Sequence, residues 1–249
     1  MENNGRQSID ALNLKSDLDL GGVVARLKAS PNVCDQRKGR DVEALMALAQ
    51  GKWSSRFSLV RAFPGPQRSL TLLCELVISG LVWRNQPEPH SDWLIALGLP
   101  WNYPLAMPGA GFLRDVPYNP HVSHRAFALE PRGLSAELHR YVEELRSGRD
   151  GGICFVRASQ WTADSTRDLA LLIWQISRIL SGNVLYGEAA ALNHSARDHY
   201  LRLKQEGKLP LGPSLPFPHE NGSLQGHFAE QAHAAVSDED PDIEWMAVR

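Results

Sequence analysis

The sequence predicts a helix-dominated protein of the α/β or α+β class, folded as a single compact domain with a small sheet and flexible termini. Its 249 residues are 43% hydrophobic, which is enough for one sizeable core. Apolar residues recur at helical spacing in several segments, whereas a single short run after a glycine turn is typical of a strand. We expect the domain to span residues 21–210, between a mobile leader at 1–20 and a disordered end at 211–249.

Two helices are predicted near the start of the domain. The first runs from Gly22 to Ser30, where Pro31 ends it. The second begins at Asp41, an N-cap carboxylate followed by apolar residues at helical spacing, and ends at Gly51.

The next two segments are apolar and harder to assign. Residues 69–83 fit a buried helix or two short strands hinged at Ser79 and Gly80, and we favour the helix. Residues 91–98 are predicted to form a compact helix that Pro100 prevents from continuing.

The second half alternates helix and strand more clearly. We expect helices at 134–146, from Asp164 or Ser165 to Ser181, and at 188–206, with one strand at 153–156. The middle helix has the clearest apolar face, formed by Leu169, Leu172, Ile173, Ile176 and Leu180.

The cysteines and the apolar runs restrict where the protein acts. Cys34, Cys74 and Cys154 have no paired spacing, which argues against a disulfide framework or a zinc knuckle and for a reducing compartment. The first twenty residues lack the apolar core of a secretory signal, and charged residues interrupt the longest apolar runs. We therefore expect a cytoplasmic protein with no membrane segment.

Charge is unevenly distributed along the chain. Residues 26–68 carry nine basic side chains against three acidic ones, whereas residues 220–249 carry seven acidic and one basic. Cations beside aromatic rings suit single-stranded nucleic acid or an acidic protein, and the acidic end could compete for them. The alternative is that these basic residues only form the solvent-exposed face of a helix. The candidate contact residues of this basic section are Arg37, Lys38, Arg40, Lys52, Trp53 and Arg56.

Two segments favour contacts with a protein. Between Pro100 and Pro131 prolines alternate with aromatic residues, a pattern typical of an interface loop whose backbone entropy is already reduced, or of a long loop that covers the core. Near the end of the chain, large apolar residues follow a cluster of acids, as in short docking motifs or in a solubilising tail. The candidate partner-binding residues are Trp101, Tyr103, Phe112 and Tyr118 in the loop, and Ile243, Trp245 and Met246 in the tail.

No local motif assigns a catalytic residue, a metal ligand or a cofactor. The leading hypothesis is therefore a non-enzymatic regulatory, inhibitory or accessory protein that acts through protein contacts. The first alternative is a nucleic-acid-binding protein that uses residues 26–68. The second is a metal-dependent hydrolase centred on His194 and Asp198, which lie four residues apart on a predicted helix, so that the carboxylate could orient the imidazole.

Overall fold

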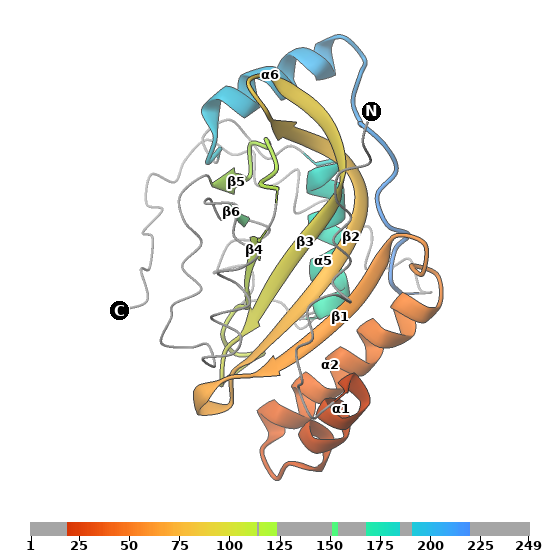
Figure 1. The fold of residues 1–249 in the computed structure, drawn as a ribbon, viewed down its shortest axis with the longest axis vertical. Coiled ribbons are helices and arrows are strands. Elements are labelled where there is room, and N and C mark those ends of the chain that lie inside the picture. The colour runs from red at the N-terminus through yellow and green to blue at the C-terminus, as the bar shows by residue number, and fades with distance from the viewer. Residues whose placement is uncertain (1–18, 114, 124–150, 154–167, 185–190, 220–249) are drawn as a thin grey trace, which may run out of the picture.

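The computed structural model describes residues 19–113, 115–123, 151–153, 168–184 and 191–219 (Figure 1). Within these ranges, two helices come first, a sheet follows, and two more helices come after it. In order, the elements are α1 (Leu20–Ala29), α2 (Val33–Gln50), β1 (Phe57–Pro64), the short 3₁₀ turn η2 (Pro66–Arg68), β2 (Leu70–Trp83), β3 (Pro87–Leu99), β4 (Gly109–Phe112), β5 (Val122–Ser123), β6 (Gly151–Ile153), α5 (Leu169–Leu180) and α6 (His194–Gln205).

The sheet is larger than the sequence suggested. Six strands lie in the order β1-β2-β3-β4-β6-β5, and every pair of neighbours is antiparallel. Its centre is the hairpin of β2 and β3, which are 14 and 13 residues long. The protein is therefore a mixed α+β fold, and the prediction of a helix-dominated domain with a small sheet is wrong.

The error comes from strands that are buried on both faces. Successive side chains of a strand point to opposite faces, yet Leu72 and its neighbour Leu73 are both fully buried, as are Ile95 and Ala96 on β3. Such strands lose the apolar and polar alternation that identifies a half-buried strand. The helices predicted at 69–83 and 91–98 are therefore strands instead.

The hinge considered at Ser79 and Gly80 marks a real irregularity. The register of β2 against β3 shifts between Val77 and Gly80. A Cβ atom on Gly80 would lie 2.9 Å from a ring carbon of Trp93, so this position requires glycine for close packing against the neighbouring strand.

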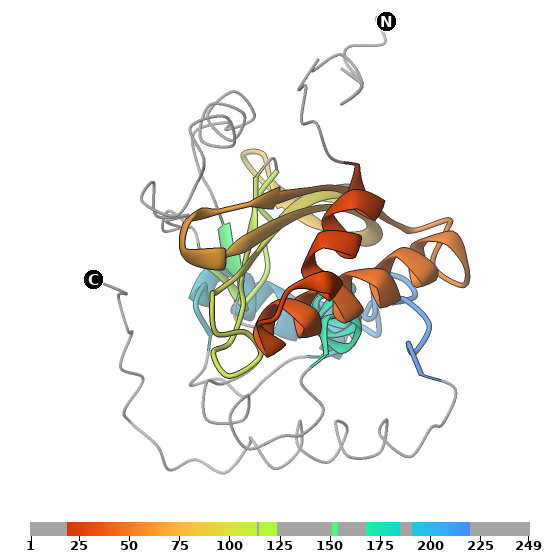
Figure 2. The same ribbon diagram turned by 90° about the horizontal axis from the view of Figure 1, so that it is seen from below.

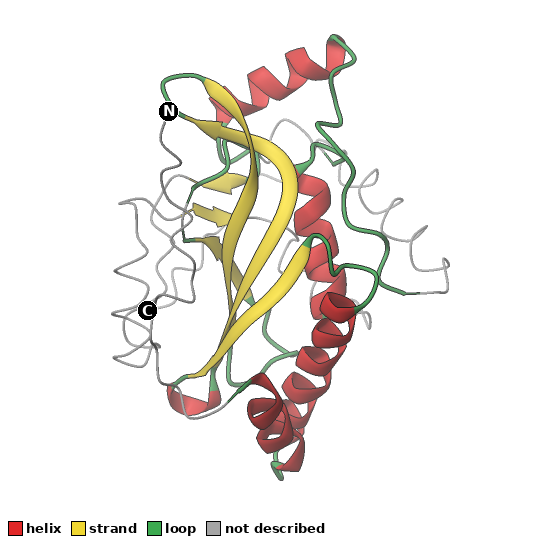
Figure 3. Cartoon of the chain, turned by 45° about the vertical axis from the view of Figure 1, so that its right-hand side comes forward, coloured by secondary structure: helices red, strands yellow, loops and turns green. Residues whose placement is uncertain are grey.

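Helices α2 and α5 cover one face of the sheet (Figures 2 and 3). All five residues of the predicted apolar face of α5 are buried, which confirms that helix, and Asp168 caps its first turn. Helices α1 and α6 are confirmed as well, although α6 begins later than predicted. Helix α2 begins at Val33 rather than at Asp41, because the side chain of the N-cap residue Asn32 accepts hydrogen bonds from the N–H groups of Cys34 and Asp35.

Residues 211–219, which we call the strap, differ from the predicted disorder. The strap leaves α6 and descends along α5 (Figure 1, blue), with Leu215 only 2% exposed. Side chains from distant parts of the chain hold its backbone, as described below. The helix predicted at 134–146, the leader up to residue 18 and the tail from residue 220 lie outside the described residues. None of the described helices is long and apolar enough to cross a membrane.

Candidate functional site

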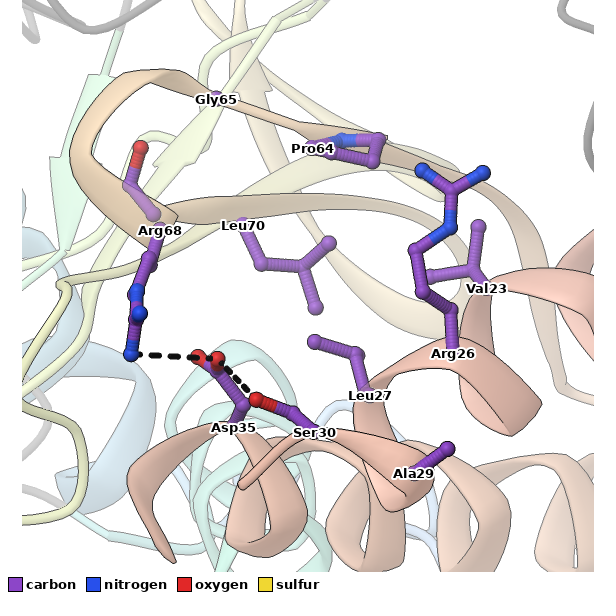
Figure 4. Close-up of a pocket in the computed structure, with 11 residues that line it drawn as sticks. Val23, Arg26, Leu27, Ala29, Ser30, Asp35, Pro64, Gly65, Arg68 and Leu70 are labelled. Atoms are coloured by element: carbon purple, nitrogen blue, oxygen red, sulfur yellow. Dashed lines mark hydrogen bonds and ion pairs between the residues drawn. The ribbon is translucent and has the colours of Figure 1, made fainter. Parts of the chain in front are cut away.

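A pocket of about 480 Å³ lies where α1, α2 and the turn between β1 and β2 meet (Figure 4). Leu27 of α1 and Leu70 of β2 face each other across it, and Arg26 and Arg68 stand on opposite sides. An apolar interior between two guanidinium groups suits a ligand that is itself apolar and carries negative charge. The lining residues are Val23, Arg26, Leu27, Ala29, Ser30, Asp35, Pro64, Gly65, Arg68, Ser69 and Leu70.

The turn that carries Arg68 has an unusual backbone. Gln67 and Arg68 both have positive φ, 51° and 63°, a region that disfavours residues with a Cβ. The carbonyl of Arg68 accepts a hydrogen bond from Nζ of Lys38 at 2.6 Å. This buried lysine therefore holds in place the turn that forms one wall of the pocket.

Asp35 lines the pocket, and its carboxylate offsets the positive charges of Lys38 and Arg68. Its Oδ2 accepts a hydrogen bond from Ser30 Oγ at 2.8 Å and lies 3.8 Å from the Arg68 guanidinium. Its Oδ1 is buried and accepts no hydrogen bond from the described residues, so the charge of Lys38 Nζ, 3.5 Å away, is what stabilises it. Burial lowers the pKa of Lys38, an effect that the Asp35 carboxylate opposes.

Exposed apolar side chains occur on α2 and on the turn after β3, which Lys38 connects to the turn that carries Arg68. Lys38 also donates a hydrogen bond to the carbonyl of Trp101 at 3.1 Å, which fixes the turn after β3 next to α2. Val33 begins α2 five residues earlier, a rise of about 7.5 Å along the helix. Val33, Leu105 and Trp101 are 73%, 64% and 58% exposed. The pocket together with Val33, Arg68, Trp101 and Leu105 is called the corner surface below.

The four candidate residues of the predicted contact loop differ in burial. Trp101 is exposed, but Tyr103, Phe112 and Tyr118 are buried. Phe112 belongs to β4 and packs edge-on against Trp93, and Tyr118 packs with α6. Three of these four aromatic residues are therefore part of the packed interior, Tyr103 and Phe112 in the main core and Tyr118 in the smaller cluster at α6. The predicted tail contacts Ile243, Trp245 and Met246 lie outside the described residues.

The basic section does not form a continuous cationic surface. Lys38 is fully buried, and Nε of Arg37 donates to both carboxylate oxygens of Asp41, at 2.8 and 3.0 Å. Arg40 is exposed. The three remaining candidates, Lys52, Trp53 and Arg56, donate hydrogen bonds to backbone carbonyls of the strap.

A buried polar cluster joins segments that sequence reasoning could not connect. The hydroxyl of Tyr103 donates a short hydrogen bond to Asp41, which Arg37 also binds. Burial raises the pKa of Asp41, and these two donors oppose the shift. The negative charge of Asp168 acts on Tyr103 and Asp41 alike, and His219 of the strap lies 3.0 Å from Asp168. The cluster ties α2, the turn after β3, α5 and the strap together.

The hydrolase centre considered at His194 and Asp198 gains no support from the geometry. Oδ1 of Asp198 accepts a hydrogen bond from Nε of its neighbour Arg197 at 2.9 Å and forms an ion pair with Nη2 of the same residue at 2.8 Å. His194 is the exposed first residue of α6. Within the ranges that the structure describes, no three His, Cys, Asp or Glu side chains are grouped so that they could hold a metal ion.

Comparisons with protein-family models, with curated proteins and with solved structures each find no match.

Proposed function

We propose that this protein is a non-enzymatic accessory or regulatory protein that binds another protein through the corner surface. The single observation that carries the proposal is the exposed Trp101 on a turn whose backbone the buried Lys38 ties to the Arg68 turn of the pocket wall. Exposed large aromatic residues on a rigid backbone are the usual energetic centres of protein interfaces.

The pocket is suited to a large apolar side chain of the partner protein. Its volume of about 480 Å³ lies within the range of about 300–1,000 Å³ typical of binding pockets. Leu27 and Leu70 offer apolar contact, whereas the nearest carboxylate, Asp35, is already engaged by Ser30, Lys38 and Arg68. A large apolar side chain of the partner would therefore fill the pocket.

The charges around the pocket favour an acidic partner. Arg26 and Arg68 flank the opening, and Arg68 is 56% exposed at its side chain. Acidic groups next to the apolar anchor would pair with these guanidinium groups and steer the encounter. The proposed ligand is thus a protein segment in which acidic residues adjoin a large apolar one. Placement in the cytoplasm is part of the same proposal, supported by the free thiols of Cys34 and Cys74.

Selection from a library of random displayed peptides tests the proposal on the full chain. We expect enrichment of sequences that combine acidic residues with a large apolar residue. Because Trp101 and Arg68 supply the apolar and the charged contact, Trp101→Ala and Arg68→Glu should each weaken the selected peptide at least about tenfold.

Trp83→Ala is the matched control, since Trp83 is exposed to a similar degree, 51% against 58%, near the turn that joins β2 to β3. It should bind the selected peptide as the wild-type chain does. The proposal fails if no sequence class is enriched, or if the peptides bind the Trp101→Ala chain as tightly as the Trp83→Ala chain.

A further inference from the structure

The backbone of the strap is held by side chains of the connection between α2 and β1. The indole N–H of Trp53 donates to the carbonyl of Pro216 at 2.8 Å. Arg56 donates to the carbonyl of Ser214 at 3.0 Å, and more weakly to that of Pro213 at 3.2 Å. Nζ of Lys52 donates to the carbonyl of Pro218 in a short hydrogen bond. Four carbonyls of one short segment are thus bound by three side chains of this connection.

Helix α5 forms a second wall. The ring of Phe217 packs edge-on against Trp174, with centroids 5.0 Å apart. The N–H of Leu215 donates to Oγ of Ser177, also on α5, at 3.1 Å. Trp53 and Trp174 are both buried, at 0% and 4% exposed. The strap therefore lies in a groove lined by two tryptophans, which we call the strap groove.

The sequence of the strap has a regular proline spacing. Pro213 and Pro216 are separated by two residues, a P-x-x-P pattern, and Pro218 follows. Each proline fixes its own φ and lacks an N–H group, so that such a segment is extended before it binds and offers mainly carbonyls. Grooves that recognise proline-rich segments in other proteins use aromatic walls and donors aimed at those carbonyls.

We propose that the strap groove is a binding site for proline-rich P-x-x-P segments of a partner protein, and that the strap is its intramolecular occupant. The hydrogen bonds from Lys52, Trp53 and Arg56 reach backbone atoms only, so they accept any segment with this backbone shape. Selectivity comes from the two side chains that enter the groove, Leu215 and Phe217. This surface is separate from the corner surface, and either proposal can fail without the other.

Covalent connection gives the strap an advantage over a free segment. A tethered ligand has an effective concentration of the order of millimolar, so a free peptide competes poorly while the strap is intact. Loosening the strap without touching the groove should therefore uncover the site. Leu215→Asp does this, because it places a charge at a position that is 2% exposed.

The test uses full-length chains and a fluorescent peptide with the sequence of residues 212–218. We expect saturable binding to the Leu215→Asp chain and binding at least about tenfold weaker to the wild-type chain. Adding Trp53→Phe, which keeps a ring but removes the indole donor, should weaken binding about tenfold, the equivalent of one hydrogen bond. Adding Trp83→Ala, which lies outside the groove, should leave binding unchanged. A peptide with alanine in place of both prolines of the P-x-x-P pattern should bind weakly.

Two other variants can be used if Leu215→Asp or Trp53→Phe does not fold. Phe217→Ser loosens the strap more gently, and Arg56→Met removes the two hydrogen bonds of the guanidinium group while keeping the aliphatic stem. The proposal is overturned if folded, strap-loosened chains do not bind the peptide, if removing the donors has no effect, or if the alanine peptide binds equally well. It is also overturned if the loosened chains form dimers whose straps exchange in preference to binding the peptide, because the occupant would then be a second copy of this chain.

Discussion

Nζ of Lys38, a fully buried cation in α2, donates a hydrogen bond to the carbonyl of Trp101 at 3.1 Å, across 63 residues of sequence. The same Nζ holds the carbonyl of Arg68 and lies 3.5 Å from Asp35. One side chain therefore joins the turn between β1 and β2 to the turn after β3. The corner surface exists as a single surface because of this lysine.

Lys38→Met is expected to lower the free energy of unfolding by about 3 kcal/mol, because it leaves Asp35 without its closest counter-charge and two carbonyls without a donor. Urea denaturation measures this loss. Lys28→Met is the control: Lys28 pairs with Glu43 at 2.8 Å, but both side chains are about half exposed, so the loss should stay below about 1 kcal/mol. Equal losses for the two variants would contradict a structural role for Lys38.

Tyr103→Phe is expected to raise the pKa of Asp41 further, because the phenol donates a hydrogen bond that stabilises the charged carboxylate. A raised pKa means that the folded chain binds the proton more tightly than the unfolded chain. Stability therefore falls as pH rises through the interval between the two pKa values, and in the variant this fall should extend to higher pH. NMR titration of the Asp41 carboxyl carbon measures the shift directly. Tyr118→Phe should leave that pKa in place, and an unchanged pKa in Tyr103→Phe would refute the expected coupling.

His121 should make the protein less stable in mild acid. It is 1% exposed, and burial lowers its pKa from 6.5 to about 4. The unfolded chain therefore binds the proton first, so stability is lost as pH falls from about 6.5 to about 4, by about 3 kcal/mol in total. Denaturation curves of the wild-type and His121→Gln chains should converge over this interval, while the exposed His194→Gln chain follows the wild type. Parallel curves for wild type and His121→Gln would disprove this role for His121.

Gly80 and Gly98 offer a paired test of the sheet packing. A Cβ atom on Gly80 would lie 2.9 Å from Trp93 and 3.3 Å from the carbonyl of Leu180, whereas a Cβ atom on Gly98 would meet nothing within 4 Å. Gly80→Ala should lose about 1–3 kcal/mol of stability because the buried Trp93 ring must move. Gly98→Ala should stay within about 1 kcal/mol of wild type or become more stable. Thermal unfolding compares the two, and equal melting temperatures would contradict the close approach of β2 to Trp93 and Leu180.

The sequence predicted the helices that carry local signals. Helices α1, α5 and α6 were found from their apolar spacing and from the residues that end them, although their N-caps, Asp19, Asp168 and Asn193, were not predicted. Strands β2 and β3 were mistaken for helices because burial on both faces removes the alternation of a strand. The start of α2 was missed because residues 33–40 are mostly polar and Asn32, not an apolar pattern, marks it.

The two candidate surfaces could not be identified without the three-dimensional structure. Trp101 and Tyr103 were both predicted as contact residues, yet Trp101 is exposed and Tyr103, two residues later, is buried, and nothing local in the sequence distinguishes them. Lys52, Trp53 and Arg56 were grouped by charge and aromaticity, while their hydrogen-bond partners lie more than 150 residues away. Pairings at such separations follow from the topology of the sheet and helices.

Photo-crosslinking from the corner surface tests the proposed function most directly. A benzoylphenylalanine at position 105 or, as control, at position 77 replaces an exposed apolar residue in the full chain, and the chains are irradiated in the cells that make the protein. We expect a defined protein adduct from position 105 that is lost when Arg68→Glu is added, and no such adduct from position 77. The absence of an adduct from position 105, or an equal yield of the same adduct from position 77, would contradict it.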